Sequence, residues 1–270
     1  MVLSDPLSTI VGMISERVRP GNATLAAKVT AASRAADRWA QPPSQLGRPL
    51  PGAELLSITD PRFPRMLRLI EDPPQHLYVR GSLGHPSDES SLAIVGSRDA
   101  TTEGIRVAEA VAGHVASLGH TIVSGLAAGI DAAAHSGALA ANGRTIAVIG
   151  TGVDRIYPAA NATLRDRIAE RGAVISQFEL GQPPSKTTFP ARNVLIAGLT
   201  RASLLVELTE RSGTRIEATI AQEQAKPVLL WEPLLGHLPW ARRYAAESLV
   251  HFVGSADSVA QALEATVAAT

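Results

Sequence analysis

A series of glycine-containing turns between residues 92 and 217 limits what this chain can fold into more than any other feature. The turns occur in LAIVGSRDATTEG, VSGLAAGIDAAAH and IGTGVDRIYP, and the segments TFPARNVLIAGL and SGTRIEA follow them. Apolar runs of strand length precede the turns, and apolar residues at helical spacing follow most of them. Strands joined by crossover helices form a parallel sheet with helices on both faces. The pattern predicts an α/β fold, extended and Rossmann-like, with a mostly parallel sheet.

The alternation of strand and helix patterns continues to the end of the chain. We expect strands at 92–95, 121–124, 145–149, 173–176, 204–207, 227–231 and 249–253. Helices are expected at about 102–118, 130–142, 161–171, 190–199, 215–224 and 256–268. Upstream, a strand, a short helix bounded by prolines and a second strand at His76–Val79 are expected to extend the edge of the sheet.

Residues 1–50 are expected to be a short helical segment with a proline-rich linker, and residues 51–270 the extended Rossmann-like domain. Leu7, Ile10, Val11 and Ile14 recur at helical spacing, and QPPSQLGRPLPG then has the composition of a linker.

Composition excludes several classes of protein. Cysteine is absent and the seven histidines are scattered, so neither a disulfide nor a metal site is expected. The sequence has no long apolar run, and its first residues lack the pattern of a secretory signal, so we expect a cytoplasmic protein without membrane contact. The 25 basic and 25 acidic residues balance, and charge alone does not decide whether nucleic acid is bound.

The first turn places small and basic residues where a phosphate can sit. Gly96 allows a ligand close to the backbone, Ser97 offers a hydroxyl, and Arg98 offers a planar cation. Such a turn is also expected to leave backbone N–H groups free at a helix N-terminus, which favours an anion.

In the second turn, Gly125 and Gly129 flank a loop that leads to Asp131, and His135 follows one helical turn later. Two interpretations of Asp131 and His135 stay open. They contact a ligand, or they serve as a helix cap and as a hydrogen-bonding partner within the fold.

The third turn contains Gly150 and Gly152, and Tyr157 follows as a residue that stacks on a base or packs within the fold. No third glycine completes a dinucleotide fingerprint, so no cofactor is expected. Lys186, Arg192 and Asn193 precede or begin the next helix, and Arg192 is the strongest single candidate for a phosphate contact.

The last turn, Ser212, Gly213 and Thr214, is small and rich in hydrogen-bond donors. Glu217 lies one helical turn beyond Thr214 and is expected on the same side. Its carboxylate either complements the helix dipole or takes part in chemistry.

Five ordered segments, DPRFPRMLRLIEDPPQHLYVRG, IVGSR, SGLAAGID, GTGVDRIYP and FPARNVLIAGL, resemble the DNA-processing protein A family, DprA or Smf, over about residues 58 to 232. The resemblance implies a homodimer that binds single-stranded DNA, helps to load a RecA-type recombinase in natural transformation and has no established catalysis. It matches the arginines of two family motifs to Arg98 and Arg192. On this interpretation Arg98, Arg106, Lys186 and Arg192 contact phosphates.

Three departures from the family pattern limit what the resemblance implies, and one of them suggests a second function. Alanine replaces the lysine that often follows the YP pair, and no C-terminal winged-helix module is expected after the last predicted helix. SGTRIE stands where SGSLIT is common and is similar to the GTxxE segment of the lonely guy phosphoribohydrolases. The alternative is therefore a nucleotide-binding protein, or an N-glycoside hydrolase of nucleoside monophosphates in which Arg192 and Glu217 are catalytic.

Overall fold

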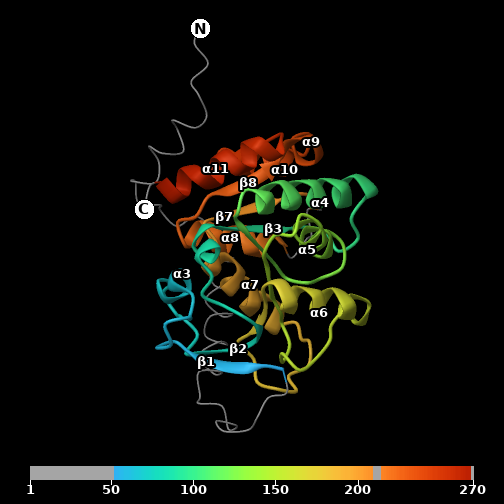
Figure 1. The fold of residues 1–270 in the computed structure, drawn as a ribbon. Coiled ribbons are helices and arrows are strands. Elements are labelled where there is room, and N and C mark those ends of the chain that lie inside the picture. The colour runs from blue at the N-terminus through green and yellow to red at the C-terminus, as the bar shows by residue number, and fades with distance from the viewer. Residues whose placement is uncertain (1–51, 209–213, 269–270) are drawn as a thin grey trace.

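The computed structural model describes residues 52–208 and 214–268, which form a nine-stranded sheet with helices on both faces (Figure 1). The strand order is β1-β2-β6-β5-β4-β3-β7-β8-β9. The strands from β6 to β9 in this order run parallel, whereas β1 and β2 pair antiparallel at one edge. The strands are β1 (Glu54–Ser57), β2 (His76–Gly81), β3 (Ser91–Val95), β4 (Thr121–Ser124), β5 (Thr145–Val148), β6 (Ala173–Ser176), β7 (Ala202–Leu205), β8 (Val228–Trp231) and β9 (Val250–Val253).

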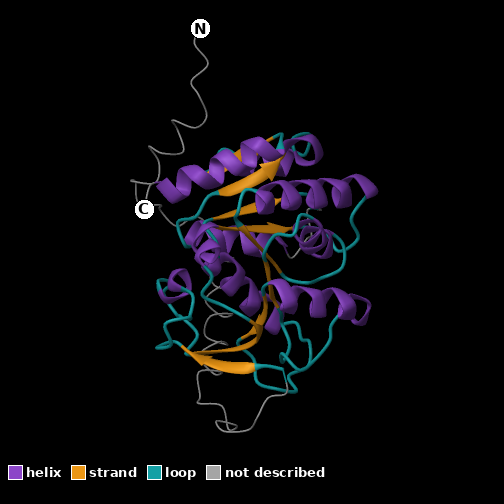
Figure 2. Ribbon diagram, in the orientation of Figure 1, coloured by secondary structure: helices purple, strands orange, loops and turns teal. Residues whose placement is uncertain are grey.

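The helices form one layer on each face of the sheet, and Figure 2 shows the strands passing between them. One layer contains α4 (Thr102–Ser117), α5 (Ile130–Ala140), α6 (Ala162–Arg171) and α11 (Ala256–Ala268). The other contains α3 (Arg65–Arg68), α7 (Thr188–Leu199), α8 (Thr214–Glu223), α9 (Glu232–Leu235) and α10 (Pro239–Tyr244). Two 3₁₀ turns, η1 (Pro86–Ser90) and η2 (Ala159–Asn161), complete the described elements.

The central strands are continuous apolar runs because both of their faces are buried. In β3, Leu92 and Ile94 pack against α4, α5 and α11, whereas Ala93 and Val95 face α7 and α8. A shift of the strand by one residue would exchange these two faces, so the packing fixes the register.

The predicted alternation of strands and helices is confirmed, and the boundaries differ by no more than two residues. The strand expected at 204–207 instead begins at Ala202, because Ala202 is the residue that pairs with Leu92 of β3. The sequence did not predict η1, α9 or α10, which are too short to show a helical period. The helical segment and linker expected within residues 1–50 lie outside the described residues. In the part of the chain that is described, no helix combines the length and hydropathy needed to cross a membrane.

The order in which successive strands are added to the sheet reverses between β3 and β7. The chain leaves β3 toward β4 on one side and leaves β7 toward β8 on the other, although β3 and β7 are neighbours. In open α/β sheets, such a switch point leaves a crevice outside the carboxyl ends of the strands, where ligands bind.

Candidate functional site

Two adjacent cavities lie at the carboxyl ends of the parallel strands. The larger, of about 570 Å³, lies at the switch point, and its lining includes Gly96 after β3 and Glu217 on α8 after β7. The smaller, of about 100 Å³, lies over the ends of β4 and β5, where Gly125, Gly150 and Tyr157 are among the lining residues. We call them the switch-point cavity and the aromatic cavity. Both are lined by Arg98, Ala127 and Phe189.

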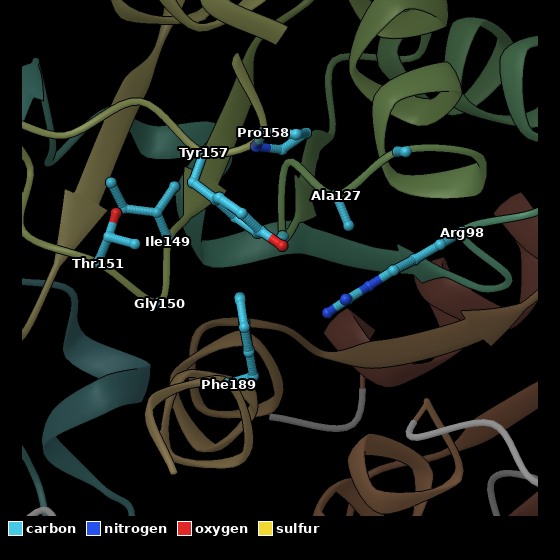
Figure 3. A pocket seen from close by; sticks show the side chains of 10 residues that line it. Arg98, Ala127, Ile149, Gly150, Thr151, Tyr157, Pro158 and Phe189 are labelled. Carbon is cyan, nitrogen blue, oxygen red and sulfur yellow. The ribbon is translucent and has the colours of Figure 1, made fainter. Parts of the chain in front are cut away.

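The aromatic cavity combines two rings with a cation (Figure 3). The centroids of the Tyr157 and Phe189 rings are 5.8 Å apart, with the planes tilted by 43°. The Arg98 guanidinium carbon lies 4.9 Å from the centroid of Phe189, a distance at which a cation is attracted to the ring face. Tyr157 is 44% exposed, so its ring is open to a partner in solvent. This arrangement offers a stacking surface beside a positive charge.

Phe189 is the site residue that sequence reasoning missed. It lies in the first turn of α7, between the two cavities, and is half-buried. The available signal was an aromatic residue directly before Pro190, Ala191 and Arg192, at a helix start that is otherwise polar or small. Aromatic residues beside proline are also common in packing, so that signal was weak.

The inner end of the switch-point cavity contains two carboxyl groups and one guanidinium. Asp131 from α5, Arg192 from α7 and Glu217 from α8 line it, and each is at most 5% exposed. Arg192 Nη1 lies 4.0 Å from Asp131 Oδ2 and donates a hydrogen bond to the carbonyl of Val148 at 3.0 Å. Glu217 Oε1 accepts a hydrogen bond from the hydroxyl of Ser203 at 2.9 Å. The fold thus brings Arg192 and Glu217 into one cavity, together with Asp131.

Burial dominates the electrostatics of this inner end. It raises the pKa of Glu217 to about 7, although the hydrogen bond from Ser203 and the charge of Arg192 act in the opposite direction. Burial also raises the pKa of Asp131, against the opposing charge of Arg192, and lowers the pKa of Arg192. Near neutral pH, Glu217 therefore exists in both protonated and ionised forms.

Gly125 is fitted to Arg192. A Cβ atom at position 125 would lie 1.3 Å from Arg192 Nη1 and 2.3 Å from its Cζ. The guanidinium of Arg192 thus lies directly against the backbone of Gly125. Arg192 itself is turned inward at the base of the cavity, so a phosphate can reach it only from inside the cavity.

Carboxylates already occupy two of the turns that were expected to present free N–H groups. At the start of α4, Glu207 accepts hydrogen bonds from the Thr101 N–H at 3.1 and 3.2 Å and from its hydroxyl at 2.7 Å. Before α5, Asp131 accepts from the N–H groups of Gly125 and Ala127 at 3.2 and 3.4 Å. A carboxylate satisfies the same donors and the same end of the helix dipole as a phosphate. At these two turns the N–H groups of Thr101, Gly125 and Ala127 are therefore bound within the fold and are not free for a phosphate.

The remaining candidates divide by position. Ser97 and Asn193 line the switch-point cavity. Arg106 is exposed on α4 and pairs with Glu103 at 2.6 Å, and Lys186 is exposed before α7. These two basic residues do not line either cavity. Neither do Gly152 and Gly129, which is the N-cap of α5 with a φ of 76°. Of the last turn, Ser212 and Gly213 lie outside the described residues, and Thr214 begins α8.

His135 serves the fold. It is fully buried, and its Nδ1 lies 2.7 Å from the hydroxyl of Thr145. Burial, with the charge of Arg192, lowers its pKa to about 3, so the ring is neutral at physiological pH. Of the two interpretations of His135, the structure supports the hydrogen bond within the fold. Across residues 52–208 and 214–268, no cluster of acidic or histidine side chains is arranged to hold a metal ion.

Comparisons with known proteins give one consistent family. The family model for DNA recombination-mediator protein A matches residues 54–259. Protein Smf of Synechocystis sp. is 46% identical over 173 residues, which are 63% of this chain and 44% of that protein. DNA processing protein DprA of Streptococcus pneumoniae is 42% identical over 174 residues, which are 64% of this chain and 60% of that protein. The chain thus spans between 44% and 60% of the length of these curated relatives.

Solved structures agree with this match. The X-ray structure of DprA from Streptococcus pneumoniae superposes with a TM-score of 0.71 at 31% identity, covering 93% of this chain and 94% of that one. DprA from Helicobacter pylori, whose structure describes a single-stranded DNA binding mode, gives a TM-score of 0.69 at 26% identity, covering 78% of this chain and 95% of that one. The family match covers well over half of the sequence and every strand of the nine-stranded sheet. This chain belongs to the DNA recombination-mediator protein A family.

Proposed function

We propose that the protein binds single-stranded DNA along the carboxyl edge of its parallel sheet. The observation that carries the proposal is the arrangement of Arg98, Phe189 and Tyr157 in the aromatic cavity (Figure 3). Sites for single strands combine aromatic rings, on which bases stack, with cations that follow the backbone. A base stacks on Phe189 or Tyr157, and the exposed Arg98 neutralises a neighbouring phosphate. Such contacts position a strand without reading its sequence.

The relatives support the same assignment. The Helicobacter pylori protein, which has a similar fold, binds single-stranded DNA. Arg98 is the phosphate contact that the geometry of this chain favours, because it is exposed and lines both cavities. The contacts proposed for Arg106 and Lys186 require a strand that extends beyond the two cavities.

Anisotropy titration of a labelled oligo-dT at several salt concentrations tests this function. Arg98→Ala should weaken binding and reduce the slope of log K against log salt by about 0.7, the value for one phosphate contact on a single strand. Phe189→Ala should reduce the free energy of DNA binding by about 1–3 kcal/mol, the range for one stacked base.

Arg171→Ala is the matched control. Arg171 is an exposed arginine at the last position of α6, two residues before β6 begins, and therefore lies at the opposite edge of the parallel sheet. Its loss changes the net charge as the loss of Arg98 does. Equal weakening by the two arginine variants, or no binding by the unaltered protein at low salt, would refute the proposed site.

Family membership supports a further part of the proposal, namely that the protein acts in the cytoplasm as a homodimer and delivers single-stranded DNA to a RecA-type recombinase during natural transformation. Light scattering on the purified protein measures the dimer directly. Assembly of recombinase filaments on strands coated with a single-strand-binding protein measures delivery, and it should accelerate when this protein is added. A monomer, or no acceleration, would contradict the respective part.

A second candidate function is hydrolysis of the N-glycosidic bond of a nucleoside monophosphate. A specific observation favours it, because Glu217 has a pKa raised to about 7 and shares the switch-point cavity with Arg192. A carboxyl group with a pKa near the working pH suits general acid and base catalysis. Incubation with nucleoside monophosphates should then release free base, and Glu217→Gln should abolish the release. Absence of free base from every common nucleotide excludes this candidate.

A further inference from the structure

The inner end of the switch-point cavity contains two buried polar atoms without a partner. Glu217 Oε2 and Arg192 Nε make no hydrogen bond in the described structure, and both side chains line the cavity. The residues are 1% and 5% exposed, respectively. Buried polar groups in native proteins are nearly always hydrogen-bonded. The two atoms are therefore complementary to a ligand group that offers both a donor and an acceptor.

The charges in the cavity differ between its inner end and its mouth. Two carboxyl groups, on Asp131 and Glu217, surround the single buried guanidinium of Arg192. Arg98 is the exposed cation at the mouth, where Ser97 and Asp99 also line the wall. A phosphodiester at the inner end would face both carboxyl groups, whereas a phosphate at the mouth contacts Arg98. An uncharged polar group fits inside, and a phosphate fits outside.

A strand that continues in both directions has a phosphate on each side of every nucleotide. One of these phosphates would have to lie at the inner end of the cavity, beside the two carboxyl groups. A terminal nucleotide has a phosphate on one side and a free hydroxyl on the other. The cavity volume of about 570 Å³ lies within the range of about 300–1,000 Å³ that is typical of small-ligand sites.

We propose that the switch-point cavity binds one nucleotide unit end first, with its phosphate at Arg98 and a hydrogen-bonding edge of its sugar or base at Glu217 and Arg192. The inference rests on the proposed binding of single-stranded DNA and names the part of the DNA that this cavity takes, the free end of a strand. Because Arg98, Ala127 and Phe189 line both cavities, the adjacent base lies in the aromatic cavity. A free nucleoside monophosphate carries the same chemistry and is the other source to be tested.

Competition experiments with three unlabelled ligands test the inference. The ligands are a linear oligo-dT, a circular oligo-dT of the same length, and dTMP, each displacing a labelled linear oligo-dT from the unaltered protein. The linear competitor should bind at least fivefold more tightly than the circular one, which has no end. Glu217→Gln should reduce that ratio, whereas Glu170→Gln, an exposed glutamate near the end of α6, should not.

The outcomes separate the inference from the proposed function. Equal affinity for linear and circular DNA, with no displacement by dTMP, overturns the inference and leaves single-strand binding intact. Displacement by dTMP that weakens in Glu217→Gln supports the cavity as a nucleotide site and identifies the free nucleotide as a source. Failure of both DNA ligands to bind overturns the proposed function and, with it, recognition of strand ends. The comparison of linear with circular DNA needs no variant, so a misfolded variant does not affect it.

Discussion

At the scale of single residues, the site depends on a glycine and an arginine that fit one another. Arg192 is held under the loop after β4 because Gly125 has no side chain and because the carbonyl of Val148 accepts its Nη1 hydrogen. The sequence placed Arg192 at the start of a helix near the crevice. It gave no sign that the guanidinium would be buried, because its acceptor is 44 residues away along the chain. Arg98 was predictable, since it directly follows the end of a strand and needs no distant partner.

Gly125→Ala tests the fit. The added methyl group would overlap the guanidinium, so Arg192 must move. Overpacking of this kind lowers the free energy of unfolding by about 1–3 kcal/mol. Urea unfolding should show that loss, and the variant should also bind single-stranded DNA less tightly. The control is Gly254→Ala, because a methyl group there meets nothing within 4 Å. Equal stability of the two variants would contradict the fit.

Glu217→Gln tests the burial of the carboxyl group. The pKa of Glu217 rises from 4.5 to about 7 on folding, so the folded protein holds a proton that the unfolded chain has released. Stability should therefore fall as the pH rises from about 4.5 to about 7 and then level off. Between pH 5 and pH 8, the free energy of unfolding should fall by about 2–3 kcal/mol because of this one group. Urea unfolding at both pH values should show that much less pH dependence in the variant. An unchanged dependence would mean that the carboxyl group is ionised throughout.

At the scale of elements, the sequence predicted the long helices and buried strands because periodicity is a local property. The position of β7 was shifted by two residues because the run from Ala202 to Leu208 is apolar apart from Ser203 and Glu207. Which four residues form the strand depends on the pairing of Leu92 with Ala202, a contact between distant segments. The same limit explains the helix termini. Occupation of the α4 N-terminus by Glu207 requires β3 and β7 to be neighbours, and no local pattern shows that.

Thr101→Ala tests the start of α4. The Thr101 hydroxyl accepts a hydrogen bond from the Gly104 N–H at 3.1 Å and donates one to Glu207 at 2.7 Å. Loss of a threonine cap typically lowers the free energy of unfolding by about 1 kcal/mol, and chemical denaturation measures this loss. Thr102→Ala alters the exposed neighbour within the helix, which is not the cap, and should cost less. If Thr102→Ala were the more costly change, the helix would begin elsewhere.

At the scale of the whole molecule, the two edges of the parallel sheet have different tasks. Both cavities lie at the carboxyl edge. At the amino edge, Asp88 of η1 forms a largely buried ion pair with Arg144 at 2.7 Å and accepts a hydrogen bond from Thr121. Arg144 also donates to the carbonyl of Ser82. These contacts link the end of β2 with the starts of β4 and β5 and join the antiparallel edge to the parallel sheet.

Asp88→Ala tests that link. Removal of Asp88 leaves the largely buried charge of Arg144 without its ion partner, and the loss of stability should approach the lower end of the about 3–5 kcal/mol typical of fully buried pairs. Glu103→Ala breaks the exposed pair with Arg106 and should cost at most about 1 kcal/mol. Thermal and urea unfolding should rank the variants in this order, while both retain affinity for single-stranded DNA if they are folded. The reverse order would contradict a structural role for the amino edge.

The wall that the two cavities share has a thermodynamic consequence. Arg98 and Phe189 belong to both, so a ligand in one cavity changes the surroundings that the other offers. Linkage requires the effect to be reciprocal: the factor by which the first ligand alters the affinity of the second equals the factor by which the second alters that of the first. If each cavity holds a ligand, Arg98 and Phe189 would couple the two binding equilibria.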